Sequence, residues 1–220
     1  MENKLDSRFF VDTDPKTDEI VFKLPNTWWS RYYEYEWAKQ FPEPDDVVLD
    51  AASGVDHPFK FYLTTVAREV HACDIDPRIM TPERVVEAIR RSWFGPEAAD
   101  IVQAKYIGNV HLKWGNLANL PYGDRTFDKV FCISVLEEMP ERDRKAAFVE
   151  FGRVLKDGGL IVLTFDYPNI DLKQLCRDVA AAGLELAGNA DFEKPANAIY
   201  TEMWGGLHCF RCVLRKREPA

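Results

Sequence analysis

The sequence lacks the segments that would place it in or across a membrane. It contains no uninterrupted apolar run close to the ~20 residues that a transmembrane helix needs. Its first residues, MENKLDSRFF, are charged and have neither the apolar stretch nor the small-residue cleavage site of a secretory signal. Internal repeats and low-complexity tracts are also missing. These absences predict a cytoplasmic protein without a membrane segment, and 220 residues suit a single domain with a short extension.

Cysteine is scarce and odd in number. Of the five cysteines, Cys73 and Cys132 lie in apolar runs, where a free thiol behaves as a small hydrophobe. Cys209 and Cys212 form one C-x-x-C, but no second pair of ligands is spaced to complete a zinc site. The sequence therefore predicts reduced, structural cysteines and no bound metal.

Positive charge is in short supply as well. The net charge is −8 at pH 7, whereas nucleic-acid affinity comes largely from Lys and Arg that neutralise phosphates. The locally basic stretch 211–217 fits a solvated strand end. The composition argues against a nucleic-acid partner, and it leaves the oligomeric state open.

Aromatic residues, in contrast, are concentrated near the start. Residues 1–44 form an extension that is polar at first and then carries six large rings: Trp28, Trp29, Tyr32, Tyr33, Tyr35 and Trp37. Too many for a polar tail, these rings are either a lid over a ligand site or part of a helix that packs on the domain. The domain itself is predicted to span residues 45–220.

Apolar periodicity in that domain alternates between strand and helix. Strands are predicted at 47–49, 69–75, 109–114, 127–135, 160–165, 184–187 and 207–215. Helices are predicted at 59–67, from 82 to a stop at Gly95-Pro96, at 142–155 and at 172–182. This alternation indicates a mostly parallel sheet with helices on both faces, whose ligand site lies at the carboxyl ends of the strands.

Two strand ends carry features of a nucleotide site. The first strand turns through Asp50-Ala-Ala-Ser-Gly-Val-Asp56, although Ala52 and Asp56 stand where a dinucleotide fingerprint would have glycines. Asp74 ends the second strand, where an acidic side chain can accept hydrogen bonds from both hydroxyls of a ribose. Alone, Asp74 would be read as a turn or helix cap.

A series of short motifs follows in a fixed order: Gly115-Asn116-Leu117, Leu120-Pro121-Tyr122, Phe127-Asp-Lys-Val130, Val135-Leu-Glu-Glu138 and Arg153-Val-Leu-Lys-Asp-Gly-Gly159. In this order they resemble the motifs of class I S-adenosylmethionine-dependent methyltransferases, over about residues 47–165. The resemblance implies a Rossmann-like, seven-stranded, mostly parallel sheet with helices on both faces and an antiparallel final strand. It also implies S-adenosylmethionine as the cofactor.

The resemblance assigns roles to residues in those motifs. Asp50 and Gly54 would line the methionine half of the cofactor, Asp74 would hold the ribose, and Asn116 would meet the adenine amino group. In the extension, Arg31 could pair with the methionine carboxylate. The full cofactor set that we expect is Arg31, Asp50, Ala52, Gly54, Asp56, Asp74, Ile75, Asn116, Leu117 and Ser134.

Methyl transfer to a hydroxyl usually also needs a base. Asp166 and Tyr167 follow the fifth strand and His208 begins the last one, so we expect catalytic groups among these three, against the alternative that they only shape a loop. A small metabolite or a glycan sugar is the expected acceptor, modified at oxygen or nitrogen. The rival hypothesis is a non-catalytic S-adenosylmethionine-binding sensor or partner subunit, which the altered glycine turn favours.

Overall fold

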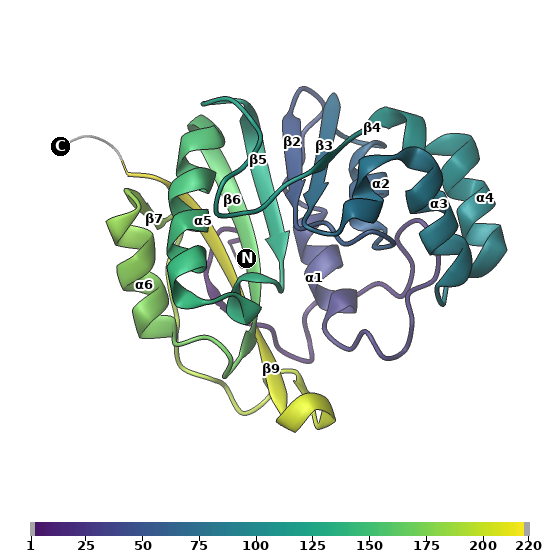
Figure 1. Ribbon diagram of the computed structural model, residues 1–220. Coiled ribbons are helices and arrows are strands. Elements are labelled where there is room, and N and C mark those ends of the chain that lie inside the picture. The colour runs from purple at the N-terminus through teal and green to yellow at the C-terminus, as the bar shows by residue number, and fades with distance from the viewer. Residues whose placement is uncertain (1–2, 218–220) are drawn as a thin grey trace.

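The computed structural model describes residues 3–217 (Figure 1). Residues 1–2 and 218–220, at the outer ends of the two predicted units, lie outside it. The described residues form one mixed sheet, with the strands β1 (Arg8–Phe9), β2 (Val47–Ala51), β3 (Glu69–Asp74), β4 (Val110–Trp114), β5 (Phe127–Ile133), β6 (Leu155–Tyr167), β7 (Leu184–Leu186), β8 (Tyr200–Thr201) and β9 (Leu207–Lys216).

The directions of the strands are those predicted, and the structure adds their order. Along the sheet the order is β1-β9-β6-β5-β2-β3-β4, and the strands from β2 to β6 pair in parallel. The last strand, β9, runs antiparallel to β6. All seven predicted strands are present, and β1 and β8 add short antiparallel pairings to β9. The predicted Rossmann-like sheet is therefore confirmed.

Helices cover both faces of the sheet (Figure 1). They are α1 (Arg31–Ala38), α2 (Phe59–Leu63), α3 (Pro82–Arg91), α4 (Gly95–Lys105), α5 (Glu141–Val154) and α6 (Leu172–Ala181), with short 3-10 turns η1 (Pro77–Met80), η2 (Ile107–Asn109), η3 (Leu136–Glu138) and η4 (Met203–Gly205). One apolar layer joins α1 to α4 with one face of the sheet, and a second joins α5 and α6 with the other. Within residues 3–217, none of these helices has the length and apolar character to cross a membrane.

The prediction for residues 82–105 was wrong in one respect. Gly95 and Pro96 do not end a helix but begin α4, where a proline costs no hydrogen bond because the first-turn N–H groups have no helical partner. The preceding helix, α3, already ends at Arg91, and Trp93 lies 87% exposed in the connection. The apolar spacing that links Val85 and Ile89 therefore stops before Trp93.

The N-terminal extension packs against the domain over most of its length. Its strand β1 pairs with β9, and Phe10, Tyr35, Trp37 and Phe41 are buried in the same layer as the sheet. Trp28 and Trp29 remain partly exposed, just before α1. The aromatic segment thus contains both core residues and residues that face outward from the carboxyl edge of the sheet.

Candidate active site

The turn after β2 adopts the conformation of a ligand loop although it has only one glycine. Gly54 has φ +61°, and a Cβ there would lie 2.7 Å from Cδ2 of His57, so only glycine fits. Ala52 has φ +54°, a left-handed conformation that costs an alanine about 1 kcal/mol. The turn has a positive φ at both Ala52 and Gly54, and position 52 has no glycine to ease it, so contacts from other residues must stabilise the turn.

Lys60, on α2, supplies those contacts. Its buried ammonium donates hydrogen bonds to the carbonyls of Ser53 (3.3 Å), Gly54 (2.6 Å) and His57 (2.7 Å). Burial lowers the pKa of Lys60 and raises the pKa of neighbouring Asp50, whose Oδ2 is buried without a hydrogen-bond partner among residues 3–217. Lys60 therefore stabilises the turn after β2 through these three hydrogen bonds, and it places a cation beside Asp50.

The second strand end presents Asp74 and Ile75 next to that turn. Oδ2 of Asp74 accepts the N–H of Gly54 and Oδ1 accepts the N–H of Asp76, each at 2.9 Å. A carboxylate has about four acceptor sites, so both oxygens can accept further donors. Ile75 is 64% exposed and offers an apolar ledge beside the carboxylate. A carboxylate beside an apolar ledge suits a ribose joined to a flat base.

The loop after β4 is held close to this ledge. Asn116 turns back on its own loop, because its Oδ1 accepts the N–H of Ala118 at 2.9 Å, and Leu117 is buried. Nε1 of Trp114 donates to the carbonyl of Ile75 at 2.9 Å. This bond ties the loop that contains Asn116 to the strand end that contains Asp74.

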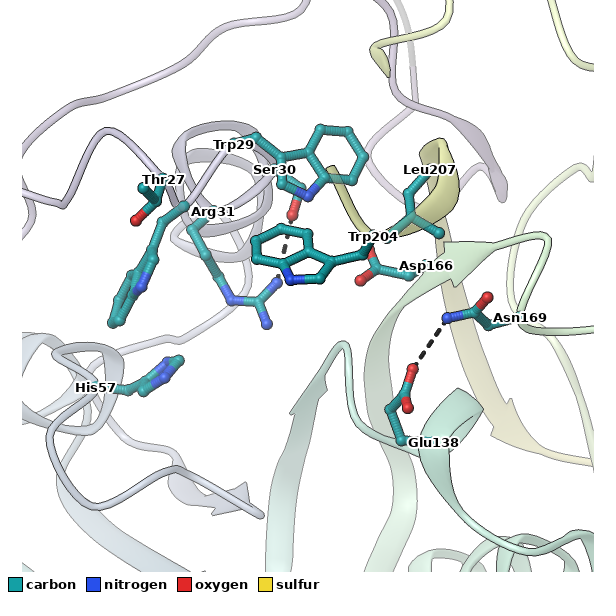
Figure 2. Close-up of a pocket in the computed structure, with 11 residues that line it drawn as sticks. Thr27, Trp29, Ser30, Arg31, His57, Glu138, Asp166, Asn169, Trp204 and Leu207 are labelled. Atoms are coloured by element: carbon teal, nitrogen blue, oxygen red, sulfur yellow. Dashed lines mark hydrogen bonds between the residues drawn. The ribbon is translucent and has the colours of Figure 1, made fainter. Parts of the chain in front are cut away.

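A cavity of about 480 Å³ opens at the carboxyl edge of the sheet (Figure 2). It is lined by residues 27–31, His57, Glu138, Asp166, Asn169, Trp204 and Leu207. Figure 2 shows the Arg31 guanidinium projecting into the cavity beside Trp204. Three indole rings thus surround a small set of charged and hydrogen-bonding groups, which is the usual composition of a small-molecule site.

Two carboxyl groups on the sheet side of the cavity have raised pKa values. Burial raises the pKa of Asp166 to about 6, the negative charge of Glu34 adds to the shift, and Arg31 opposes it. Oδ1 of Asp166 is buried and has no hydrogen-bond partner in the part of the chain that the structure describes. Behind it, burial raises the pKa of Glu137 to about 8, and Oε1 of Glu137 accepts the N–H of Asp166 at 2.7 Å.

Helix α1 is anchored beneath the cavity by the carboxylate of Glu34. Its Oε1 accepts hydrogen bonds from Ser134 Oγ (2.5 Å), Thr164 Oγ1 (2.5 Å) and Cys209 Sγ (3.4 Å), which lie just after β5, on β6 and on β9. Its Oε2 accepts from Arg31. Burial alone would raise the pKa of Glu34, but the charge of Arg31 and the two hydroxyls outweigh it and lower the pKa.

His57 links the turn to the extension. Its ring stacks on Trp28 with centroids 4.2 Å apart, and its Nδ1 lies 3.0 Å from the hydroxyl of Tyr35. Burial lowers the pKa of His57, so the ring is neutral at pH 7. The ring forms one wall of the cavity and carries no charge there.

The three residues expected to be catalytic do not share one face of the sheet. Asp166 pairs with Cys209 and faces the cavity, whereas Tyr167 pairs with His208 one position further along. Because side chains alternate across a strand, Tyr167 and His208 point to the opposite face, where both rings meet Phe9. Of the three, only Asp166 lines the cavity.

The cysteines of the C-x-x-C are separated by the same alternation. Cys209 faces the layer of α1, with its Sγ against Glu34, and Cys212 faces the layer of α5 and α6. Both are buried, and burial raises both thiol pKa values. These two side chains cannot hold one ion between them.

Comparison with known proteins identifies the family. Residues 49–163 match the family model described as a methyltransferase domain, which is just over half of the chain. The chain belongs to the class I S-adenosylmethionine-dependent methyltransferases. A demethylmenaquinone methyltransferase of Staphylococcus haemolyticus is 42% identical over 60 residues, 27% of this methyltransferase and 24% of the relative. The chain thus spans about a quarter of that relative's length.

Solved structures share the fold at low identity. A TehB-like methyltransferase from Corynebacterium glutamicum superposes with a TM-score of 0.59 at 18% identity, over 84% of this chain and 87% of the other. A putative sarcosine dimethylglycine methyltransferase from Galdieria sulphuraria gives 0.58 at 15% identity, over 90% and 86%. The cyclase SpnF gives 0.63 at 15%, over 96% and 87%. Together these likenesses support the fold of this methyltransferase and leave its acceptor undetermined.

S-adenosylmethionine is the cofactor of this methyltransferase, and the residues present fit it. The unpartnered Oδ2 of Asp50 is a buried acceptor at the β2 end, and the Asp74 carboxylate beside exposed Ile75 suits an adenosine. Sequence reasoning missed Lys60, since a lysine among aromatic residues reads as a surface position. It also missed Trp204, which lies in the short turn before β9 without a motif around it.

Proposed function

We propose that this methyltransferase methylates a small polar acceptor, a metabolite or a sugar unit, at an oxygen or nitrogen held in the cavity beside Asp166. The observation that supports the proposal best is the unpartnered, buried Oδ1 of Asp166 at the carboxyl end of β6. A buried polar atom without a partner is costly unless something binds to it. A rotation of the Asp166 carboxylate that turns Oδ1 toward the cavity would let an acceptor O–H or N–H donate to it and would remove the cost.

The walls of the cavity support a ring-shaped, polar acceptor. Trp28, Trp29 and Trp204 provide flat apolar surfaces, and Glu138 with Asn169 provides hydrogen-bonding groups on the opposite side. A sugar presents apolar C–H faces and a rim of hydroxyls, so it matches both kinds of wall. An amine would also find negative charge here.

For the cofactor, we propose that Asp74 receives the ribose hydroxyls and that Ile75, Asn116 and Leu117 surround the adenine. Asp50, with Ala52, Gly54, Asp56 and Ser134, would line the methionine half, and Arg31 would neutralise its carboxylate. When bound, S-adenosylmethionine supplies an activated methyl group. The turn fastened by Lys60 then positions the cofactor, because displacement at a methyl carbon depends mainly on orientation.

Asp166 is the residue that we propose as general base. With a pKa raised to about 6, its carboxylate is ionised at neutral pH yet more basic than an ordinary aspartate. It would take the proton that the acceptor loses as the methyl group arrives. The rate should therefore fall as the pH drops below about 6, where the carboxyl group becomes protonated.

The acceptor proposal is tested by labelled methyl transfer to a panel of sugars, nucleotide sugars and amines. Asp166→Asn should lower kcat by about 10²–10⁴-fold and remove the acidic limb of the pH profile, with S-adenosylhomocysteine affinity unchanged. Glu138→Gln is the comparison variant: Glu138 lines the same cavity and accepts a hydrogen bond from Asn169, so this change can alter the KM for the acceptor but should keep the acidic limb of the pH profile. An Asp166→Asn enzyme as active as wild type would refute the base.

Binding is tested separately, so that the non-catalytic alternative can be recognised. S-adenosylhomocysteine should raise the melting temperature of wild type, since a ligand that binds only the folded state stabilises it. Asp74→Ala should abolish the shift, and Asp76→Ala, on the exposed side of the same turn, should keep it. Tight binding with no transfer to any acceptor would instead support a sensor, as the altered glycine turn suggests.

A further inference from the structure

Three side chains that coordinate transition metals lie together on β3 and β4, away from the cavity. His71 of β3 is the parallel register partner of His111 on β4. Glu69 precedes His71 by one full strand repeat, so it lies on the same face. Strand β4 is the edge of the sheet (Figure 1), and His111 is 64% exposed there, so the cluster is accessible from solvent.

The potential ligand atoms of the three side chains converge. All lie within 4.8 Å of one another; Nε2 of His71 is 2.7 Å and Nε2 of His111 is 3.9 Å from Oε1 of Glu69. The imidazole rings stack, with centroids 4.8 Å apart. Ligands at ~2.0–2.2 Å from a tetrahedral zinc ion lie roughly 3.4 Å apart, so small rotations of these side chains produce that geometry.

We propose that Glu69, His71 and His111 bind one zinc ion or a similar divalent transition metal. Two imidazoles and a carboxylate form a ligand set that zinc uses when its fourth position is left to water. Both histidines line a cavity of about 440 Å³, which leaves space for that water. Magnesium and calcium prefer oxygen ligands throughout, so the two imidazoles select against them.

The charge around the cluster permits a cation. Lys113, two residues after His111, directs its ammonium to the carbonyl of Pro121 at 2.8 Å and lies over the ring of Tyr122. Its positive charge is thus held by other partners on the loop side. Glu69 supplies one negative charge directly at the ligand atoms.

A metal at this site would link the edge strand β4 to its neighbour β3. Strand β4 pairs only with β3 among the described residues, and it ends at Trp114, whose indole bonds to the carbonyl of Ile75. A metal bridge between His71 and His111 would add a side-chain link to the backbone ladder that joins these two strands. Zinc would therefore stabilise the edge that contains the proposed adenosine contacts, and it would lie outside the cavity of about 480 Å³ beside Asp166.

The sequence did not predict this site because the ligands are distant along the chain. Only Glu69 and His71 are neighbours in sequence, and His111 joins them through the register of β3 and β4. Metal motifs are recognised by short spacings, such as the C-x-x-C that this fold splits between two faces. A ligand set built across two parallel strands has no such spacing.

Calorimetric titration of the full chain with zinc chloride, after dialysis against a chelator, tests the proposal. Wild type should bind one equivalent and show a melting temperature that rises with zinc concentration. His111→Ala should weaken binding at least tenfold, and Glu69→Gln should weaken it as well. His208→Ala is the matched control, since His208 is a partly exposed histidine on β9 that contacts Lys194 and Ile199 instead.

The zinc titrations can support the proposed site or overturn it. Zinc binding that is saturable, is lost in His111→Ala and persists in His208→Ala supports the site. Absence of saturable binding in wild type, or equal binding in wild type and His111→Ala, overturns it. An equal rise in melting temperature with magnesium chloride would also overturn it, because these ligands should not favour that ion.

Discussion

Replacing Glu34 tests whether a single buried carboxylate fixes the extension to the sheet. Its two oxygens accept hydrogen bonds from Ser134, Thr164, Cys209 and Arg31, with Ser30 adding one more at 2.9 Å. Glu34→Ala removes the acceptor for all of these donors and leaves the Arg31 guanidinium without its negative partner. Glu34→Gln keeps the size of the side chain but removes the charge.

The expected loss of stability follows from these contacts. Removing one partner of a buried ion pair costs about 3–5 kcal/mol, out of a total unfolding free energy of about 5–15 kcal/mol. For a chain of this size, 1 kcal/mol corresponds to a shift in melting temperature of about 2–4 °C. Glu34→Ala should therefore melt roughly 10 °C below wild type, and Glu34→Gln should fall between the two.

Thermal unfolding followed by circular dichroism measures the effect. Glu36→Gln is the control, because Glu36 lies on the same helix but pairs with Lys39 near the surface, and its melting temperature should change little. Folding lowers the pKa of Glu34, so its stabilisation is fully present above the unfolded pKa of about 4.5 and is lost as the pH falls through the lower, folded pKa. A Glu34→Gln protein that melts with wild type at pH 7 would refute the anchor.

Two further predictions concern buried charges. Lys60→Met should lower the unfolding free energy by about 3 kcal/mol and weaken S-adenosylhomocysteine binding, because three carbonyls of the turn lose their hydrogen-bond donor. Urea unfolding measures the first effect and calorimetry the second, and unchanged values would contradict the role of Lys60. Glu137 has a folded pKa raised to about 8, so wild type should lose stability relative to Glu137→Gln as the pH rises from about 4.5 to 8. The difference should approach about 4–5 kcal/mol, because each pH unit between the two pKa values contributes about 1.4 kcal/mol, and parallel stability curves between pH 5 and 9 would exclude it.

The parts of the fold that depend on local patterns could be predicted from the sequence. Strand ends at Asp50 and Asp74 follow from short apolar runs closed by an acid, and the ordered motifs from Gly115 to Gly159 were sufficient to indicate the family. Turn chemistry gave the wrong prediction at Gly95-Pro96, since the same dipeptide can close one helix or open the next.

The parts that depend on contacts between distant segments could not be predicted. Glu34 is charged, so local patterns assign it to the surface, yet it is buried by hydrogen bonds from Ser134 and Thr164, which lie at least 100 residues away along the chain. The face of the sheet on which each residue near the end of β6 lies could not be predicted either. The strand extends to Tyr167, beyond the predicted end at residue 165, and the alternation of side chains along it places Asp166 toward the cavity. The motifs therefore predicted which edge of the sheet contains the site, but they did not predict which side chains at that edge face the cavity.

The residues that anchor α1 to the sheet differ from the tryptophans that form the walls of the proposed acceptor cavity. Trp28 and Trp29 precede the anchored helix, and Trp204 lies in a turn before β9, so the indole walls come from two short connections. Neither connection contributes a strand to the register of the parallel sheet. Residues 203–206 can therefore be exchanged, by design or by descent, to suit a different acceptor, whereas Trp28 and Ser30 must be kept, because Trp28 stacks on His57 and Ser30 donates a hydrogen bond to Glu34.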